Sequence, residues 1–175
     1  PLSQWLRHDI EATDHIVISS RIRLARNFDG LLFTNRNDTS ALEKVNAISR
    51  GLLQPLKDAD GHQYSNISLE QLSQSERAVL VEKHLMSPAL EEKLPYRNLV
   101  VSDDASIVIM VNEEDHLRIQ SMVSGLRLQE AYEHAQKIDK AIEAKYPYAF
   151  DERFGYLTAC PTNVGTGLRA SVMLH

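Results

Sequence analysis

Apolar positions along the chain follow two periods, one typical of β-strands and one typical of helices. Period-two alternation, or a short apolar run bounded by polar residues, predicts strands over 16–24, 98–101, 106–111, 154–158 and 168–174. The polar pair Asp103-Asp104 lies between two of these segments and predicts a β-hairpin. After the third segment and a polar turn, the chain regains strand character through Ile119.

The first helical pattern follows the opening strand. Ser40 and Glu43 form a capping-box pattern ahead of an amphipathic stripe, and the helix is expected to end near Pro55. The polar run Asp58-Ala59-Asp60-Gly61 predicts a turn.

Further helices are predicted over 75–85, from Ser87-Pro88 as a short element with proline at its first position, and over 126–144. The last has the strongest stripe, formed by Leu128, Ala131, Tyr132, Ala135, Ile138 and Ile142. This order of strands and helices, with a hairpin among them, predicts an α+β fold in which helices flank an antiparallel β-sheet.

The first predicted strand carries arginines on one face. Side chains alternate along a strand, so Ser19, Arg21 and Arg23 share one side, while Ser20 and Ile22 take the other, which can face a core. Two guanidinium groups this close repel each other unless an anion lies between them. A solvated strand face would give the same pattern, so both interpretations stay open at this point.

A second cluster of charges follows the apolar run 107–111. The acids Glu113-Glu114-Asp115 are followed at once by His116 and Arg118. Consecutive acids after a strand usually form a solvated turn, but adjacent cations favour a site. His84, near the end of a predicted helix, is a weaker candidate, because a surface histidine is the commoner case.

The third cluster lies near the carboxyl end. A loop rich in Gly, Thr and Asn, residues 160–167, contains the only cysteine, Cys160, and leads into a strand that presents Arg169. Glycines let backbone N–H groups approach an anion closely, and the arginine supplies a planar guanidinium suited to phosphate. A tight turn between strands, with Cys160 as a small buried apolar residue, is the plain alternative.

Together these segments resemble the phosphagen (guanidino) kinase family. Ser-Ser-Arg-x-Arg at 19–23, Asn-Glu-Glu-Asp-His at 112–116 and Cys-Pro-Thr-Asn-x-Gly-Thr at 160–166 occur in the family's order and at compatible spacing. The run SSRIRLARN at 19–27, the run LRIQ at 117–120 and the short segment before the first strand are similar to the bacterial protein-arginine kinases. The chain has no P-loop pattern and no H-R-D or D-F-G set.

The resemblance implies a nucleotide site made of arginines. It places the phosphates of ATP against Arg21, Arg23, Arg118 and Arg169. Other positions implied to contact the nucleotide are Ser19, Ser20, Ile22, His84 (against the adenine), Ala170, Ser171, Val172 and Met173. Mg²⁺ is expected to be held mainly by the phosphates and water, with no protein ligand.

The acceptor is implied to be a guanidinium group. Its pKa lies above ~12, so its nitrogen lone pair is delocalised, and a carboxylate is needed to align it and accept a proton. The resemblance assigns this catalytic role to Glu114, with Glu113 and Asp115 in support. It also places Cys160 near the guanidinium, where positive charge would favour the thiolate.

Composition is that of an ordinary globular protein, with 43% apolar and 25% charged residues in 175. The net charge of −5 argues against a general nucleic-acid binder. No run is long enough to cross a membrane, and one cysteine excludes an intrachain disulfide. A cytoplasmic protein with no direct nucleic-acid or membrane partner is therefore expected.

Two segments are predicted, an N-terminal stretch 1–15 and a catalytic domain over 16–175. Because the last strand reaches His175 without a turn signal, and family members continue further, the domain is expected to be truncated at its C-terminus. Further phosphate-binding arginines and a second acid would lie beyond it. The 175-residue chain by itself is therefore expected to be inactive.

The leading functional hypothesis is an ATP-dependent protein-arginine kinase. A phosphagen kinase acting on free arginine or another small guanidino compound is the close alternative, and a catalytically inactive nucleotide-binding or adaptor module is the third. The resemblance further implies a role in bacterial stress response and protein quality control. The implied partners are protein substrates with exposed arginine, including a heat-shock repressor, a zinc-containing activator protein and a Clp ATPase–protease.

Overall fold

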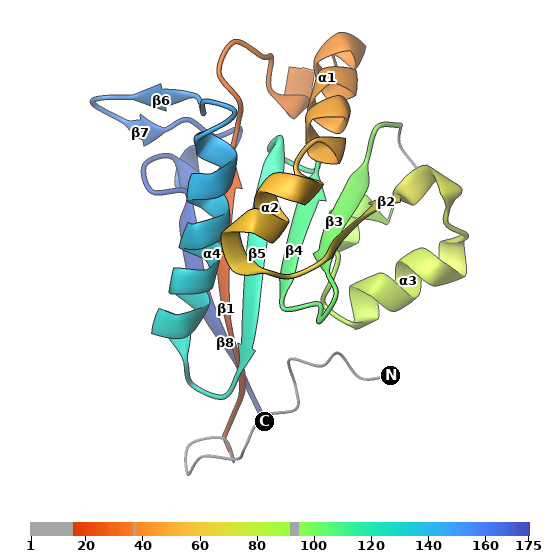
Figure 1. The fold of residues 1–175 in the computed structure, drawn as a ribbon, viewed down its shortest axis with the longest axis vertical. Coiled ribbons are helices and arrows are strands. Elements are labelled where there is room, and N and C mark those ends of the chain that lie inside the picture. The colour runs from red at the N-terminus through yellow and green to blue at the C-terminus, as the bar shows by residue number, and fades with distance from the viewer. Residues whose placement is uncertain (1–15, 37, 92–94) are drawn as a thin grey trace.

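The centre of the fold is an antiparallel β-sheet (Figure 1). The computed structural model describes residues 16–36, 38–91 and 95–175, so the predicted segment 1–15 lies outside the described residues. Within them, six strands pair in the order β2-β3-β4-β5-β1-β8, every pair antiparallel. They are β1 Val17–Arg26, β2 Tyr64–Ser68, β3 Asn98–Ser102, β4 Ile107–Val111, β5 Leu117–Ser124 and β8 Leu168–Leu174. The predicted α+β class and antiparallel sheet are confirmed.

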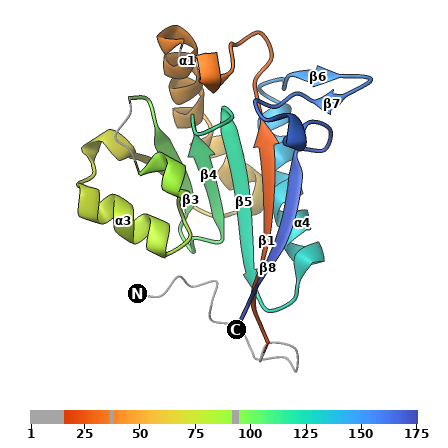
Figure 2. The same ribbon diagram turned by 180° about the vertical axis from the view of Figure 1, so that it is seen from behind.

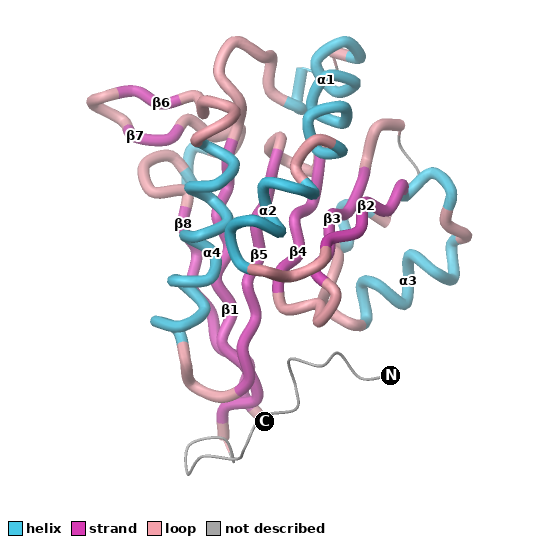
Figure 3. Tube along the Cα trace, viewed as in Figure 1, coloured by secondary structure: helices cyan, strands magenta, loops and turns pink. Residues whose placement is uncertain are grey.

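Helices in the described part of the chain cover one face of this sheet, as the helix and strand layers in Figures 1 and 3 show. They are α1 Thr39–Arg50, α2 Leu53–Asp60 and α4 Leu128–Glu143. Their apolar sides form the larger core with alternate residues of β1, β4 and β5, such as Ile22, Ile109 and Ile119. Ala131 and Ile138 from the predicted stripe of α4 are fully buried there, so burial of this stripe holds α4 on the sheet.

The opposite face is covered only in part. The helix α3 Gln74–Glu82 and the 3₁₀ turns Leu69–Gln71 and Pro88–Leu90 lie on the β2–β4 side, where a second apolar core includes Leu99 and Met110. Figure 2 shows β5, β1 and β8 from this side with no described helix over them. This uncovered part of the sheet is where polar side chains can gather.

Smaller elements complete the chain. Single 3₁₀ turns span Thr34–Arg36 and Pro161–Asn163, and a separate two-stranded ribbon is formed by β6 Phe150–Asp151 and β7 Gly155–Tyr156. The strand predicted over 154–158 is thus reduced to two residues paired in this ribbon. The strand β2 was not predicted, because its sequence lacks the alternation of apolar and polar residues.

The first helical region differs from its prediction. Asp38, not Ser40, is the N-cap of α1, and its carboxylate accepts from the Ala41 N–H at 2.8 Å. The chain then restarts as α2, with Pro55 in the first turn, where a missing N–H leaves no helical hydrogen bond unmade. The predicted turn 58–61 is the end of α2, closed by Gly61 at φ 86°.

Candidate active site

Four arginines lie on the uncovered part of the sheet. In β1 the predicted alternation holds, with Ile22 in the core while Arg21 and Arg23 are partly exposed on the other side. Strand register brings Arg169 of β8 opposite Arg23, and Arg118 of β5 two residues along, opposite Ala25. Three strands therefore converge their guanidinium groups on one area.

These arginines repel one another. Burial and then the charges of Arg169 and Arg118 lower the pKa of Arg21. Burial and three neighbouring guanidinium groups lower the pKa of Arg23 to about 10, although Glu113 acts in the opposite direction. Among the described residues, neither forms an ion pair, and the buried Nε of Arg23 has no acceptor. Such a site favours binding of an anion with several oxygens.

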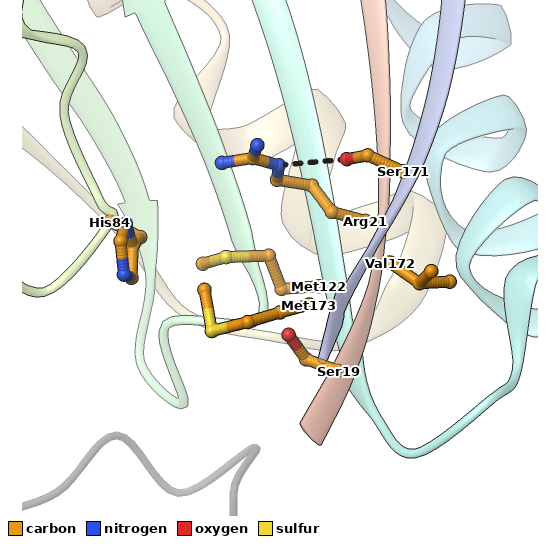
Figure 4. A pocket seen from close by; sticks show the side chains of 7 residues that line it. All are labelled: Ser19, Arg21, His84, Met122, Ser171, Val172 and Met173. Carbon is orange, nitrogen blue, oxygen red and sulfur yellow. Dashed lines mark hydrogen bonds between the residues drawn. The ribbon is translucent and has the colours of Figure 1, made fainter. Parts of the chain in front are cut away.

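One pocket, about 150 Å³ in volume, lies at the amino end of β1. Its lining consists of Ser19, Arg21, His84, Met122, Ser171, Val172 and Met173. Figure 4 shows the Met122 and Met173 side chains reaching toward His84, and Arg21 Nε donates to Ser171 Oγ at 3.3 Å. The pocket is therefore apolar in the middle and cationic at one end, a combination suited to a nucleoside with phosphates.

His84 reaches this pocket from an unusual backbone conformation. It follows α3 at φ 58°, the left-handed position where helices usually end in glycine. Its N–H donates to the Val81 carbonyl and the Leu85 N–H to the Leu80 carbonyl, which is the Schellman pattern. A non-glycine residue here is strained, and its side chain is directed to the pocket.

A second pocket, about 180 Å³ in volume, lies at the other end of β1. It is lined by Arg23, Ala25, Glu114, Arg118, Cys160, Thr162, Asn163, Gly167 and Arg169. Three cationic side chains thus face one carboxylate and one thiol. Arg23 lies in this pocket and Arg21 in the first, so adjacent positions on one strand face connect the two pockets.

The acidic segment divides into buried and exposed members. The Glu113 carboxylate is buried, pairs with Arg118 Nη1 at 2.8 Å and accepts from Ser87 Oγ at 2.8 Å. The Glu114 side chain is 43% exposed and only 3.5 Å from Arg118 Nη2. Its backbone carbonyl accepts from the Thr34 hydroxyl. Glu114 is therefore the acid left available to a bound molecule.

Asn27 at the end of β1 holds the acidic segment against the cysteine loop. Its Nδ2 donates to Asp115 Oδ1 at 2.7 Å, its Oδ1 accepts from the His116 N–H, and Asp115 Oδ1 also accepts from the Ala159 N–H at 2.7 Å. Asp115 is buried at 2% exposure, as a structural carboxylate would be. This network fixes Glu114 and Cys160 on the same rim.

His116 has a structural position. Its Nδ1 accepts from the Phe28 N–H at 3.0 Å, so Nε2 carries the proton and donates to the Leu32 carbonyl at 2.9 Å. Burial lowers the pKa of His116, with the Leu32 hydrogen bond and Asp115 acting in the opposite direction. The ring is fully buried and does not reach either pocket.

Cys160 is half-buried and precedes the 3₁₀ turn Pro161–Asn163. Its Sγ lies 3.0 Å from Thr162 Oγ1. The loop is held at its far end by Arg26, whose guanidinium donates to the Thr166 carbonyl and forms a buried ion pair with Asp139 of α4 at 2.7 Å. The loop is thus tied to the helix layer.

Some predicted contacts are not brought into the pockets. The Ser20 hydroxyl is buried on the helix side, where it donates to the Gly125 carbonyl, and the Ile22 side chain is in the core. Strand alternation directs both away from Arg21. Ala170 lines neither pocket. Conversely, Met122 was not predicted, although it shares a strand face with Arg118 and alternation would have found it.

A possible cation site lies away from both pockets. In the described part of the chain, His62, Asp103 and Asp104 hold ligand atoms within 4.8 Å of one another, near the β3–β4 turn. These groups already bond to each other, with His62 Nδ1 2.9 Å from Asp103 Oδ1.

Among the described residues, no helix is both long and apolar enough to cross a membrane.

The family follows from comparison with known proteins. The family model of the ATP:guanido phosphotransferase C-terminal catalytic domain matches residues 44–175. The chain belongs to this family. Its relatives include the protein-arginine kinases of Syntrophomonas wolfei, 44% identical over 172 residues, and Symbiobacterium thermophilum, 47% identical over 176 residues. These alignments cover 98% and 99% of the chain but 48% and 49% of the relatives, so the chain spans about half their length.

Solved structures agree in fold. The duplicated taurocyamine kinase from Schistosoma mansoni, determined with transition-state analogue components, matches at a TM-score of 0.83 and 29% identity, over 95% of this chain and 24% of that chain. A lombricine kinase matches at a TM-score of 0.77 over 97% of this chain and 50% of that chain. At 24% identity, this match supports the fold alone.

Proposed function

We propose that the protein is an ATP-dependent protein-arginine kinase, which transfers the γ-phosphoryl group of ATP to the guanidinium of arginine residues in proteins. The observation that carries this proposal is the second pocket, where the exposed carboxylate of Glu114 faces Arg23, Arg118 and Arg169. A single available acid beside clustered cations fits an acceptor that is itself a cation and a donor that is a polyanion.

ATP fits the arrangement of the two pockets. The apolar lining around Met122 and His84 suits the base, and Arg21, Arg23, Arg118 and Arg169 suit the phosphates. The unsatisfied Nε of Arg23 and the repulsion among the guanidinium groups supply the attraction for them. Since Glu114 is the only carboxylate among the described residues that line the two pockets, Mg²⁺ would be held by the phosphates and water.

Glu114 has the exposure needed to act on an acceptor. Its carboxylate would align the acceptor guanidinium, making the nitrogen attack the γ-phosphorus in line. The N–P bond forms as the bond from phosphorus to the ADP oxygen breaks, and the proton lost by the nitrogen passes to the Glu114 carboxylate. The cations stabilise the charge on the transferring phosphoryl oxygens. Cys160, on the same rim, would contact the guanidinium.

The acceptor class rests on the relatives. Those at 44–47% identity are named protein-arginine kinases, which supports an arginine within a protein. The 29% identical structure is a taurocyamine kinase, which supports a small guanidino compound as the second candidate. The former is preferred because the identity is higher. A nucleotide-binding adaptor without transfer is the remaining alternative.

The wider setting extends the same proposal. The protein would act in the cytoplasm in stress response and protein quality control, on protein substrates that include a heat-shock repressor. A zinc-containing activator protein and a Clp ATPase–protease would be its partners. Affinity capture with each candidate partner, with and without ATP, tests these associations.

The proposal is tested by acceptor choice. The full-length protein is incubated with γ-labelled ATP and either an arginine-containing protein, the same protein with its arginines replaced by lysine, or free arginine. Acid-labile label on the first protein alone is expected. Label on free arginine alone would assign the small-molecule activity, and nucleotide binding without any transfer would assign the adaptor.

A further inference from the structure

Gln120 of β5 lies beneath the junction of the two pockets. Its register partners are Arg23 on β1 and Val108 on β4, so its side chain is on the same sheet face as the arginines. It is two residues from Arg118 and two from Met122, which line the second and the first pocket. At 1% exposure it is a buried amide, which needs hydrogen-bond partners.

The Gln120 amide hydrogen-bonds to the backbone of His84, the residue in the strained left-handed conformation. Its Nε2 donates to the His84 carbonyl at 2.8 Å and lies 3.5 Å from Met122 Sδ. His84 is held at φ 58°, and such a conformation persists only where surrounding contacts fix it. The bond therefore fixes the peptide that follows His84, and with it the direction in which the His84 side chain leaves the backbone.

A second connection ties the same loop to the phosphate end. Three residues after His84, the Ser87 hydroxyl donates to Glu113, whose buried carboxylate pairs with Arg118. Leu85 and Met86 anchor the loop in the smaller core. These contacts hold the loop on the sheet in addition to the Gln120 hydrogen bond. The specific effect of Gln120 is on the His84 carbonyl.

We propose that Gln120 is a positioning residue for the nucleotide base: by holding the His84 carbonyl it fixes the His84 ring in the first pocket. Loss of the Gln120 amide would then weaken binding of the base while leaving the phosphate contacts intact. This inference rests on the proposed function, because it takes the first pocket to be the base site. A ring that is already held in place loses less conformational entropy when the nucleotide binds. The buried Gln120 amide can therefore affect nucleotide affinity without contacting the nucleotide.

The test compares two ligands in the full-length protein. Gln120→Met keeps the length of the side chain and removes the amide. Calorimetry measures the Kd of MgATP and of magnesium tripolyphosphate, which has the phosphates without a base. We expect Gln120→Met to raise the Kd of ATP about 2- to 10-fold, the size of one hydrogen bond, and to leave the Kd of tripolyphosphate unchanged. Gln129→Met, on the exposed side of α4, is the matched control.

A double substitution tests whether Gln120 acts through His84. His84→Gly relieves the left-handed strain and removes the ring, so adding Gln120→Met to it should cause no further loss of ATP affinity. Equal losses for both ligands, an unchanged Kd for ATP, or fully additive substitutions would overturn the inference. A misfolded Gln120→Met variant is recognised by a changed circular dichroism spectrum, independently of ligand binding, and Gln120→Leu, which also lacks the amide, then takes its place in both comparisons. If the unsubstituted protein binds tripolyphosphate but not ATP, the base site is wrong, and if it binds neither ligand, the proposed function fails with it.

Discussion

At the scale of single residues, three consecutive acids have three different surroundings. Glu113 is buried with Arg118 and Ser87, Asp115 is buried with Asn27, and Glu114 between them is exposed at the rim of the second pocket. Neighbouring side chains in an irregular segment point in different directions, so the outer two can be anchored while the middle one is presented. Anchors on both sides restrict the backbone of Glu114, which suits a residue that must align an acceptor.

Glu114→Gln should therefore abolish transfer without abolishing nucleotide binding. The amide keeps the shape but cannot accept a proton, and losing one general base typically lowers kcat ~10²- to 10⁴-fold. Single-turnover rates and the Kd of ATP are measured in the full-length protein. Glu43→Gln, an exposed substitution on α1, is the control. Near-normal turnover would move the role to another carboxylate.

The charged Arg23 side chain should lower the stability of the ligand-free protein. At neutral pH it is charged, below its folded-state pKa of about 10, while burial and like charges oppose that charge. Arg23→Met should thus raise the melting temperature of the ligand-free protein and remove most of the further rise caused by ATP. Differential scanning fluorimetry with and without ATP measures both.

Arg153→Met, an exposed change on the β6–β7 ribbon, provides the comparison for Arg23→Met. It should leave the ATP-induced rise intact. A fall in the ligand-free melting temperature on Arg23→Met would show that Arg23 stabilises the fold, contrary to the repulsion argument.

At the scale of elements, the start of β8 depends on a close backbone approach. The Gly167 carbonyl accepts from the Ala25 N–H at 2.8 Å, and Gly167 has φ 62°. A Cβ there would lie 2.6 Å from both the Ala25 carbonyl oxygen and Arg26 Nη1. Glycine thus lets β8 begin beside the buried Arg26–Asp139 pair and places Arg169 next to Arg23.

Gly167→Ala is expected to lower the free energy of unfolding by roughly 2–5 kcal/mol, combining left-handed strain with overpacking. Gly30→Ala is the matched control, because Gly30 has φ 70° and no atom lies within 4 Å of the position that an alanine Cβ would take there. It should cost only the strain, about 1–2 kcal/mol. Equal losses in urea unfolding would mean that the close approach at Gly167 contributes nothing.

At the scale of the whole molecule, the sheet formed by the described strands ends in β8, an edge strand that exposes apolar side chains. β8 pairs with β1 alone among the described strands. Leu168, Val172 and Leu174 are 39%, 39% and 56% exposed. An unpaired edge with apolar side chains is a template for pairing with another chain.

The 175-residue chain should accordingly self-associate as its concentration rises. Leu174→Lys, a charge near the end of the edge strand, should reduce this association. Leu126→Lys, at a site 50% exposed but outside β8, should not. Sedimentation velocity over a concentration series gives the result. A monomer at all concentrations, or equal effects of the two lysines, would rule out pairing through β8.

Much of the molecule was predictable where the information is local. The alternation in β1, the hairpin of β3 and β4, the stripe of α4 and the strand β8 follow from periodicity, because neighbouring residues alone determine which side chains share a face. The residue types of the acidic segment and the cysteine loop likewise led to the family, since phosphates and guanidinium groups need particular partners. Strand alternation and the family resemblance together made Arg21, Arg23 and Glu114 candidate site residues.

Tertiary structure decided what depends on pairing between distant segments. Only the sheet order sets Arg169 opposite Arg23, and only packing places His84 over Gln120, 36 residues away. Packing likewise decided that a second helix, α2, begins just before Pro55 and that residues 64–68 form a strand, neither of which the local pattern predicted. Burial also separated Glu113 and Asp115 from Glu114. The sequence identifies the chemical groups that the site needs. Their spacing, burial and electrostatic surroundings are set only when long-range contacts bring the strands together.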